Sequence, residues 1–402
     1  MARTNILITG SAGLVGMHVL YELLGDRDAD HTIHAVLRPS RSGGAGERLS
    51  GLLSNPWMPD RLRGAVEAAA GRVRPLEVDL RDGPALARSV RDAVPAGEPL
   101  TVVHCAGSVN LENSGAAAED VAEHNVLGTR VLLDSLGGRV DRFVHVSTAY
   151  CSGVDQGVVG DDYLGLQGRT YRNPYEASKA AAEIELAAKC RDRDIGLHIV
   201  RPSIICGRVM DAPLYYTPKF DVFYGWLRFF WQMRKAGLHG GGVRLAIPAG
   251  STMNVVPVDY VARAVARAAS VDVGQVNVVS PAPVPTRLVC AAGLACIGYD
   301  DVRFVDALPA DPTRLEEVYA ASVGRLFEAY IDDASTTFSA DGAESFMRPV
   351  EFPAMLPHLS GIVSFAIDHE FDDRRIDMPR PAPAIVPVTV PHFDGQRAWE
   401  AT

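Results

Sequence analysis

The sequence contains little cysteine and no excess of basic residues. Six of its 402 residues are cysteine, and none forms a Cys-x-x-Cys pair or stands beside histidines at zinc-finger spacing. A disulfide framework and a structural metal site are therefore not expected, and a reducing, cytoplasmic location fits this composition. Lysine and arginine number 39 against 49 aspartates and glutamates, which gives a formal net charge of -10. This balance argues against a broad basic surface for nucleic acid or anionic lipid.

Charged residues are also missing from one N-terminal stretch. Between Ile6 and Tyr21 there is no Asp, Glu, Lys or Arg, so the segment resembles a signal or membrane sequence in composition. Three glycines interrupt it, whereas a membrane-spanning helix needs about 20 consecutive, mostly apolar residues. We therefore predict no membrane span.

The same stretch has the order of a strand, a glycine loop and a helix. The apolar run Asn5–Thr9 is followed by Gly10-Ser-Ala-Gly-Leu-Val-Gly16 and then by a helical pattern. In this order Gly10 makes a tight turn, Gly13 lets a pyrophosphate approach the backbone, and Gly16 lets the helix pack against the strand. An ordinary glycine-rich turn is the alternative. The pattern predicts a dinucleotide-binding loop made of Gly10, Ser11, Ala12, Gly13, Leu14, Val15 and Gly16.

Strands and helices continue to alternate along the first half of the chain. Further strands are predicted at 32–37, 73–78, 100–104 and 142–146, a helix at about 117–136, and a long connection with a helix at 40–70. This alternation favours an α/β fold, a Rossmann-type doubly wound parallel sheet with a smaller C-terminal substrate-binding subdomain. We assign residues 1–206 and 251–280 to an NADP-binding domain. Residues 207–250 and 281–402 are assigned to the substrate-binding subdomain and a C-terminal extension.

The end of the second strand indicates which dinucleotide is bound. It ends at Arg38 and carries no acidic residue to accept the ribose 2'-hydroxyl. A cation at this place suits the 2'-phosphate of NADPH, and Arg41 is a second candidate for the same phosphate. A solvated arginine at a strand end is the alternative for Arg38.

Two later strand ends add candidate cofactor contacts. Asp79, followed by Leu80, could accept a hydrogen bond from the adenine amino group, or could cap a helix. Small residues at the end of the next strand would let the chain pass close to a flat ligand. They are Cys105, Ala106 and Gly107.

A tyrosine and a lysine at helical spacing carry the predicted chemistry. Tyr175 and Lys179 lie one turn apart near the start of a helix, and Ser147 and Thr148 follow the strand at 142–146. A nearby ammonium lowers the pKa of a phenol, so Tyr175 could donate a proton once hydride has reached a carbonyl carbon. Ser147 or Thr148 could hold the same carbonyl oxygen. The alternative is a surface helix pair without a catalytic role.

Taken in order, these motifs resemble the extended short-chain dehydrogenase/reductase superfamily. The resemblance covers roughly residues 4–275, and it rests on the glycine loop, Asp79-Leu80, Asn125 in Asn-Val-Leu-Gly, Ser147-Thr148, Tyr175-x-x-x-Lys179 and Arg201-Pro202-Ser203. It implies that Tyr175 donates the proton and that Lys179 lowers the pKa of Tyr175 and binds the ribose. Thr148 or Ser147 would orient the carbonyl, and Asn125 would support the helix and a proton relay. The resemblance also implies cofactor contacts from Asn125, Val146, Pro202, Ser203 and Ile204.

Five segments are similar to a narrower branch, the fatty acyl-CoA reductases and the thioester reductase domains of carboxylic acid reductases and peptide synthetases. They are residues 104–110, 144–151, 173–179, 199–207 and 254–260. In that branch the catalytic hydroxyl aligns with Thr148. The branch implies NADPH-dependent reduction of an acyl thioester of CoA or a carrier protein to an aldehyde, with further reduction to the alcohol left open. A reductase or dehydrogenase of a free ketone, aldehyde or alcohol, a sugar-nucleotide epimerase and an NADP-sensing regulator are the alternatives.

Aromatic residues gather between Gly207 and Gly250. We predict that Phe223, Trp226 and Phe230 line an acyl pocket, which Val109 also contacts. A subdomain core or a dimer face is the alternative, and a homo-oligomer is compatible with this sequence. Three basic residues in the same stretch could bind the phosphates of CoA or phosphopantetheine, or could form a solvated face. They are Arg228, Arg234 and Lys235. The proline-rich stretch 379–391 is expected to be extended.

Overall fold

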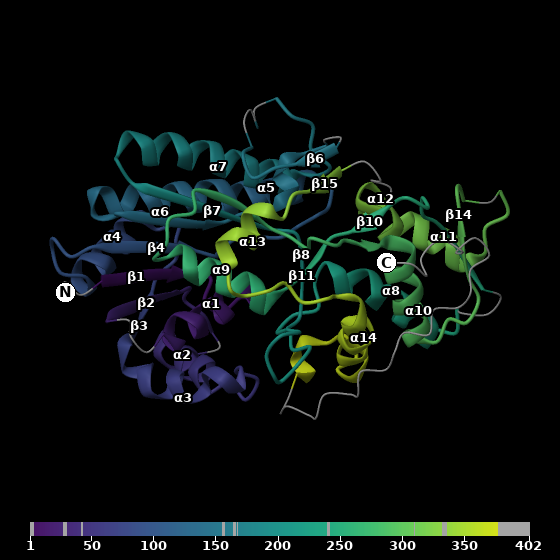
Figure 1. Ribbon diagram of the computed structural model, residues 1–402, viewed down its shortest axis with the longest axis horizontal. Helices are drawn as coiled ribbons and strands as arrows, with labels where there is room; N and C mark the ends of the chain where they lie inside the picture. Colours follow the sequence, from purple (N-terminus) through teal and green to yellow (C-terminus); the bar gives the residue numbers. More distant parts are fainter. Residues whose placement is uncertain are drawn as a thin grey trace.

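A parallel sheet of seven strands is the centre of the protein. The computed structural model describes residues 4–26, 30–41, 43–154, 157–163, 166, 168–238, 242–308, 310–331 and 336–376. The strands follow the order β3-β2-β1-β4-β5-β7-β12, and every neighbouring pair is parallel (Figure 1). They span β1 Thr4–Thr9, β2 His31–Leu37, β3 Val73–Glu77, β4 Leu100–His104, β5 Arg142–Val146, β7 Gly196–Pro202 and β12 Gln275–Val278. The strand order reverses at β1 and β4, as in doubly wound nucleotide-binding folds, so the predicted Rossmann-type fold is confirmed.

Helices cover both faces of the sheet, because its central strands are apolar on both sides. Along β1, Ile6 and Ile8 join one hydrophobic core and Leu7 joins the other, as expected for side chains that alternate between faces. The first core is closed by α1 (Leu14–Gly25), α3 (Asp60–Ala69) and α9 (Val258–Ala268). The second is closed by α4 (Gly83–Ala93), α6 (Gly128–Leu136) and α7 (Pro174–Asp192).

Two regions differ from the prediction. The helix expected at about 117–136 is divided into α5 (Gly115–Val121), a π-helical turn (Ala122–Leu127) and α6. The connection at 40–70 contains two helices, α2 (Ala45–Leu53) and α3, instead of one. A π turn adds a residue within a helix while the apolar pattern continues around it, so periodicity alone did not reveal it.

Most of the remaining helices and short strands lie to one side of the sheet, whereas α13 (Asp341–Met347) packs against α9 and β12 (Figure 1). The aromatic insertion forms α8 (Phe223–Lys235), which packs against α10 (Thr286–Ile297) and α14 (Leu359–Asp368). Between them the chain forms α11 (Arg314–Tyr319), α12 (Arg325–Ile331) and α13. Short strand pairs connect these elements: β8 (Ile204–Cys206) with β11 (Val255–Pro257), β9 (Val243–Ala246) with β14 (Val302–Val305), β10 (Thr252–Met253) with β13 (Val284–Pro285), and β6 (Gly157–Val159) with β15 (Thr336–Phe338).

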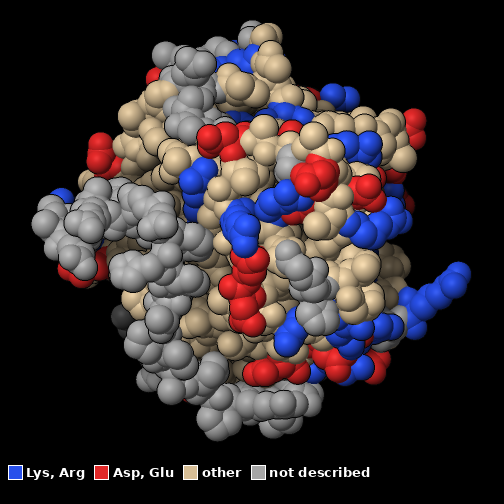
Figure 2. Space-filling model, turned by 90° about the vertical axis from the view of Figure 1, so that its right-hand side faces the viewer, with Lys and Arg blue, Asp and Glu red and all other residues tan. Residues whose placement is uncertain are grey.

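Acidic and basic side chains intermingle on the face formed by this C-terminal part (Figure 2). Ion pairs within it join Arg244 to Glu316 at 2.9 Å and Lys235 to Glu370 at 3.2 Å. The part of the chain that the structure describes contains no helix long and apolar enough to span a membrane, and no cluster of three or more side chains suited to a metal ion. The proline-rich stretch 379–391 lies outside the described residues.

Candidate active site

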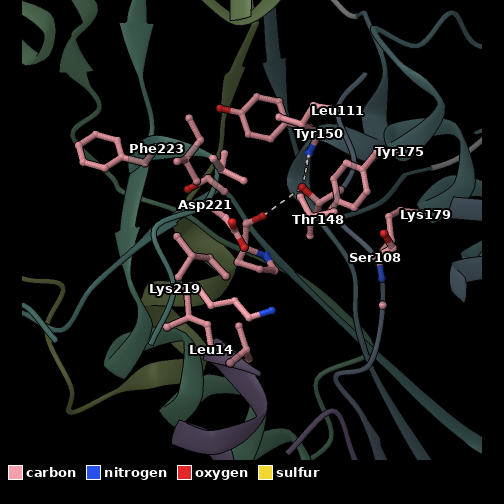
Figure 3. A pocket seen from close by; sticks show the side chains of 18 of the residues that line it. Leu14, Ser108, Leu111, Thr148, Tyr150, Tyr175, Lys179, Lys219, Asp221 and Phe223 are labelled. Carbon is pink, nitrogen blue, oxygen red and sulfur yellow. Dashed lines mark hydrogen bonds between the residues drawn. The ribbon is translucent and has the colours of Figure 1, made fainter. Parts of the chain in front are cut away.

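A cavity of about 670 Å³ opens at the carboxyl ends of the central strands. The loops after β1, β4, β5 and β7 line it, together with residues of α8 and α12. In Figure 3, Phe223 at the start of α8 lies across the cavity from Thr148 and Tyr175. Open parallel sheets bind ligands at this edge, near the point where the strand order reverses. The cavity therefore joins the predicted nucleotide-binding loop to the predicted substrate residues.

Glycines shape the end of the cavity nearest β1. Gly10 has a φ of +69°, and a Cβ at this position would lie 2.7 Å from the backbone nitrogen of Ala106. A Cβ at Gly16 would collide with the carbonyl oxygen of Gly10. After Gly13, α1 begins with no side-chain cap and no acidic residue in its first turn. The N–H groups at this helix start and its positive dipole end suit the phosphates of a dinucleotide, so the residues present fit that group.

Asn125 ties two segments of the site together. Its Oδ1 accepts a hydrogen bond from the N–H of Ser108 at 2.8 Å. Its Nδ2 donates to the carbonyl oxygen of Ser108 at 3.0 Å and to Oγ of Ser178 at 2.9 Å. A Cβ at Gly107 would lie only 2.9 Å from Oδ1 of Asn125, so this glycine permits the close approach. The π turn thus places Asn125 where it links the loop after β4 to α7.

Lys179 lies on the first turns of α7 and is held by the sheet. Both Tyr175 and Lys179 line the cavity, as expected for residues four apart on one helix face. The Nζ of Lys179 donates to the carbonyl oxygen of Val146 at 2.7 Å. Burial lowers the pKa of Lys179 to about 8, while the nearby Glu183 acts in the opposite direction. The Lys179 side chain is therefore mostly an ammonium ion at neutral pH, on the same helix face as Tyr175.

The pKa of Tyr175 is raised in this structure, whereas Lys179 was expected to lower it. Burial raises the pKa of the Tyr175 phenol above its ordinary value, and Cys151 and Glu176 raise it further. A hydrogen bond with Thr148 opposes this shift. Burial prevails because a phenolate away from water loses more solvation than one hydrogen bond restores. Tyr175 is therefore a neutral phenol at physiological pH, and this is the protonation state of a proton donor.

The two hydroxyls after β5 face different partners. Thr148 Oγ1 donates to the carbonyl oxygen of Pro202 at 3.4 Å and accepts from the N–H of Tyr150 at 3.3 Å. Figure 3 shows Thr148 beside the ring of Tyr175. Ser147 Oγ instead donates to the sulfur of Cys151 at 3.8 Å. Of the two predicted candidates, the geometry favours Thr148 as the partner of Tyr175.

Most residues predicted for the cofactor and substrate line this one cavity. They are Gly13, Leu14, Val15, Gly16, Arg38, Cys105, Ala106, Gly107, Val109, Asn125, Val146, Ser147, Thr148, Tyr175, Lys179, Pro202, Ser203, Ile204, Phe223 and Trp226. Seven predicted residues are absent from its lining: Gly10, Ser11, Ala12, Arg41, Asp79, Leu80 and Phe230. Asp79 forms an ion pair with Arg81 at 2.7 Å, and the hydrogen bonds from that guanidinium hold the pKa of Asp79 at about 2.

Phe230 belongs to the core of the C-terminal part. Its side chain is completely buried, and its ring centroid lies 4.6 Å from that of Trp226 and 5.4 Å from that of Tyr319. Arg234 and Lys235, the basic residues at the end of α8, also contact neighbouring groups of the C-terminal part and do not line the cavity. Arg234 donates to the carbonyl oxygen of Ile297, and Lys235 lies 4.3 Å from the ring centroid of Trp231. The helix thus turns only part of its aromatic surface to the cavity.

Sequence analysis missed the contribution of α12. Phe327, Tyr330 and Ile331 line the cavity. Lys219 and Asp221, which precede α8, line it as well (Figure 3). The spacing of the three α12 residues, i, i+3 and i+4, is that of one helix face and was visible in the sequence. Nothing in the sequence, however, connected that face to motifs some 150 residues earlier.

Comparison with known proteins found a matching family and several curated relatives. The sequence profile of a family described as "male sterility protein" matches residues 8–265. Fatty acyl-CoA reductase 1 from Mus musculus is 27% identical over 229 residues, which cover 50% of this chain and 43% of that protein. The chain spans about half or less of the length of the curated relatives that it matches.

Two solved structures show the same fold. The terminal R domain from the myxalamid PKS-NRPS biosynthetic pathway has a TM-score of 0.67 at 20% identity, covering 94% of this chain and 93% of that chain. UDP-glucuronic acid 4-epimerase from Bacillus cereus, in complex with UDP-glucuronic acid and NAD, has a TM-score of 0.58 at 16% identity, covering 91% of this chain and 99% of that chain. At these identities the likeness concerns the fold alone.

Proposed function

Because this chain belongs to the male sterility protein family, we propose that it is an NADPH-dependent reductase that converts an acyl thioester to an aldehyde. Membership confirms the predicted resemblance to the thioester reductase and fatty acyl-CoA reductase branch of the extended short-chain dehydrogenase/reductases. The chain is thus an oxidoreductase with a nicotinamide dinucleotide as cofactor. The choice of NADPH and of a thioester is our inference.

The continuous cavity is the observation that carries this proposal. Its lining includes the start of α1, which suits phosphates, and aromatic side chains of α8 and α12. Thr148, Tyr175 and Lys179 line the same cavity. A substrate with an apolar acyl chain would have its reactive carbonyl next to the two hydroxyls while its chain lay against the aromatic side chains.

Thr148, Tyr175 and Lys179 would stabilise the negative charge that develops on the carbonyl oxygen. When bound, NADPH supplies the hydride that reaches the carbonyl carbon. Thr148 and Tyr175 donate hydrogen bonds to the carbonyl oxygen, and the charge of Lys179 favours the negative charge that develops there. Tyr175 then gives its proton to that oxygen, which leaves a hemithioacetal.

Breaking the carbon–sulfur bond completes the reaction. As the aldehyde forms, the hydroxyl proton of the hemithioacetal returns to Tyr175, and the departing thiolate takes a proton from water. The net change is the transfer of one hydride and one proton to the thioester, with release of a thiol. No covalent bond to the protein is needed.

Arg38 supports the choice of NADPH. It lines the cavity close to the glycine loop, at the end of β2 where a ribose 2'-substituent is bound in this fold. Both Arg38 and Arg41 are exposed, but only Arg38 lines the cavity, so Arg38 is the stronger candidate for the 2'-phosphate.

Parallel assays of NADPH oxidation and thiol release test the proposal. Acyl-CoA thioesters of increasing length are supplied, and both products are followed, with Tyr175→Phe as the inactive control. Equal amounts of thiol and oxidised NADPH indicate release of an aldehyde, and half as much thiol indicates reduction to the alcohol. The thioester assignment would be overturned if NADPH were oxidised with ketones or aldehydes but not with any thioester, whether on CoA or on a carrier protein.

A further inference from the structure

One side chain of α12 reaches both the cavity and the start of α7. Tyr330 lines the cavity, and its hydroxyl accepts a hydrogen bond from Nδ2 of Asn173 at 2.7 Å. The same hydroxyl hydrogen-bonds to the carboxylate of Glu176. Asn173 and Glu176 flank Tyr175 in the sequence, so Tyr330 contacts the residues on both sides of the proton donor.

Both partners of Tyr330 hold the first turn of α7. Asn173 is the N-cap, and its Oδ1 accepts from the N–H of Glu176 at 3.1 Å. The carboxylate of Glu176 accepts from the N–H of Arg172 at 3.0 Å and pairs with the guanidinium of Arg172 at 3.4 Å. The side chains of Glu176 and Arg172 are 0% and 3% exposed, so these bonds form away from water. A buried carboxylate keeps its place only while such donors surround it.

A second contact docks α12 on the same place. Nε of Arg172 donates to the carbonyl oxygen of Ala329, next to Tyr330 in the chain. The ring of Tyr330 meets the ring of Tyr150 edge-on, with centroids 5.3 Å apart. Tyr150 follows Thr148 by two residues and also lines the cavity. The end of α12 therefore contacts both segments that carry the reactive hydroxyls.

We propose that Tyr330 is a positioning residue, which holds the first turn of α7 so that the Tyr175 hydroxyl is aligned with the substrate carbonyl. The proposal rests on the proposed function, and it links the wall of the substrate cavity to the proton donor through one side chain. Asn173 can cap the helix and donate to Tyr330 at once because its amide offers an acceptor and a donor. Loss of the Tyr330 hydroxyl leaves the Asn173 amide and the Glu176 carboxylate short of one partner each, which frees the helix start to shift.

Tyr330→Phe tests this role because it removes the hydroxyl and keeps the ring that forms the cavity wall. Misplacement of a reacting group by about 1 Å can cost about a hundredfold in rate, so we expect kcat to fall about tenfold for a smaller shift. KM for the thioester and the affinity for NADPH should stay within about twofold, since the binding surfaces are unchanged. The kinetic isotope effect with 4-deuterated NADPH should rise, because hydrogen transfer becomes more rate-limiting.

Tyr299→Phe is the matched control. The Tyr299 hydroxyl is also buried in the C-terminal part, where it donates to the carbonyl oxygen of Phe230 at 3.0 Å. Loss of the Tyr299 hydroxyl should lower Tm about as much as loss of the Tyr330 hydroxyl does. In Tyr299→Phe, however, kcat and the isotope effect should stay at wild-type values. Equal effects of the two variants on kcat, or a rise in KM alone for Tyr330→Phe, would overturn the positioning role.

Hydrogen exchange separates this inference from the proposed function. In the protein without substrate, peptides covering residues 173–180 should exchange faster in Tyr330→Phe than in wild type or Tyr299→Phe. This result does not depend on which substrate is reduced, so it stands even if every thioester fails. Wild-type exchange in Tyr330→Phe would overturn the link between α12 and α7.

Discussion

Lys179 and Val146 are joined by a hydrogen bond of 2.7 Å between the ammonium and the backbone carbonyl oxygen. The bond connects α7 to the end of β5, the strand that leads to Thr148. This bond holds the ammonium on the same face of α7 as Tyr175, and the ammonium donates to Val146 instead of the Tyr175 hydroxyl. In the proposed reaction, Lys179 would therefore act on the negative charge that develops on the carbonyl oxygen more than on the resting phenol.

Turnover should fall as the pH rises above about 8, because Lys179 loses its proton there. Burial lowers the pKa of this lysine from its ordinary value of 10.5 to about 8, so between these two pH values the unfolded chain binds more protons than the folded one. The contribution of Lys179 to the free energy of unfolding consequently increases with pH across that window, while activity decreases. Profiles of kcat and Tm against pH would show opposite slopes.

The matched control for this prediction is Lys189→Met. Lys189 lies on the same helix and pairs with Asp134 at 2.8 Å near the surface. This variant should keep the alkaline loss of activity, whereas Lys179→Met should have low activity without it. A wild-type kcat that stays constant to pH 10 would show that Lys179 does not titrate in the reaction.

The hydroxyl of Thr148 should matter more than its shape. Thr148→Val keeps the branched side chain but cannot donate to a carbonyl oxygen, and kcat should fall about a hundredfold or more, as when an oxyanion donor is removed. Thr148→Ser keeps the hydroxyl and should lose far less. Tyr175→Phe should also lose about a hundredfold or more, while NADPH affinity measured by fluorescence titration changes little. Near-normal turnover in Thr148→Val would point to Ser147 instead.

Arg38→Asp should shift the preference from NADPH towards NADH. A charge-assisted hydrogen bond contributes about 1.5–3 kcal/mol, so affinity for NADPH should weaken about tenfold to a hundredfold. NADH should gain, because the new carboxylate can accept from the 2'-hydroxyl. Arg41→Asp adds the same charge outside the cavity lining and should change the ratio of the two dissociation constants only slightly. Tighter binding of NADH than NADPH by wild type would refute the role of Arg38.

The parallel sheet and the helix face shared by Tyr175 and Lys179 could be predicted from the sequence, because local sequence patterns specify both. Consecutive apolar residues such as Ile6, Leu7 and Ile8 mark strands buried on two faces, and four-residue spacing puts Tyr175 and Lys179 on one helix face. These features depend on residues close in the chain. They can therefore be predicted without knowledge of the tertiary fold.

The parts that escaped prediction depend on residues distant in the chain. The pKa of Tyr175 follows from burial by several elements, which no spacing reveals. The place of α12 beside α7 depends on how residues after 281 pack, and motifs did not reach that far. On α8, Trp226 and Phe230 are one helical turn apart, yet only Trp226 lines the cavity. The ring of Phe230 packs instead against Tyr299, just after α10, and Tyr319 of α11.

This difference on α8 yields a prediction about substrate length. Each buried methylene contributes about 0.8 kcal/mol, so lengthening the acyl chain should raise kcat/KM about fourfold per carbon until the cavity is filled. Phe223→Ala and Trp226→Ala remove walls of the cavity and should flatten this dependence, while NADPH affinity is retained. The measurement is kcat/KM against a series of acyl-CoA thioesters for wild type and both variants.

Phe230→Ala serves as the control from the same helix. Its ring is buried in the core, so truncation should cost about 3–5 kcal/mol of stability, as for other large-to-small core changes, and lower Tm. The dependence of kcat/KM on chain length should keep its wild-type slope, measured below the lowered Tm. If Phe223→Ala and Trp226→Ala also kept that slope and lost only stability, the acyl chain would lie elsewhere, and the wall formed by Phe327 and Ile331 of α12 would be the next place to test.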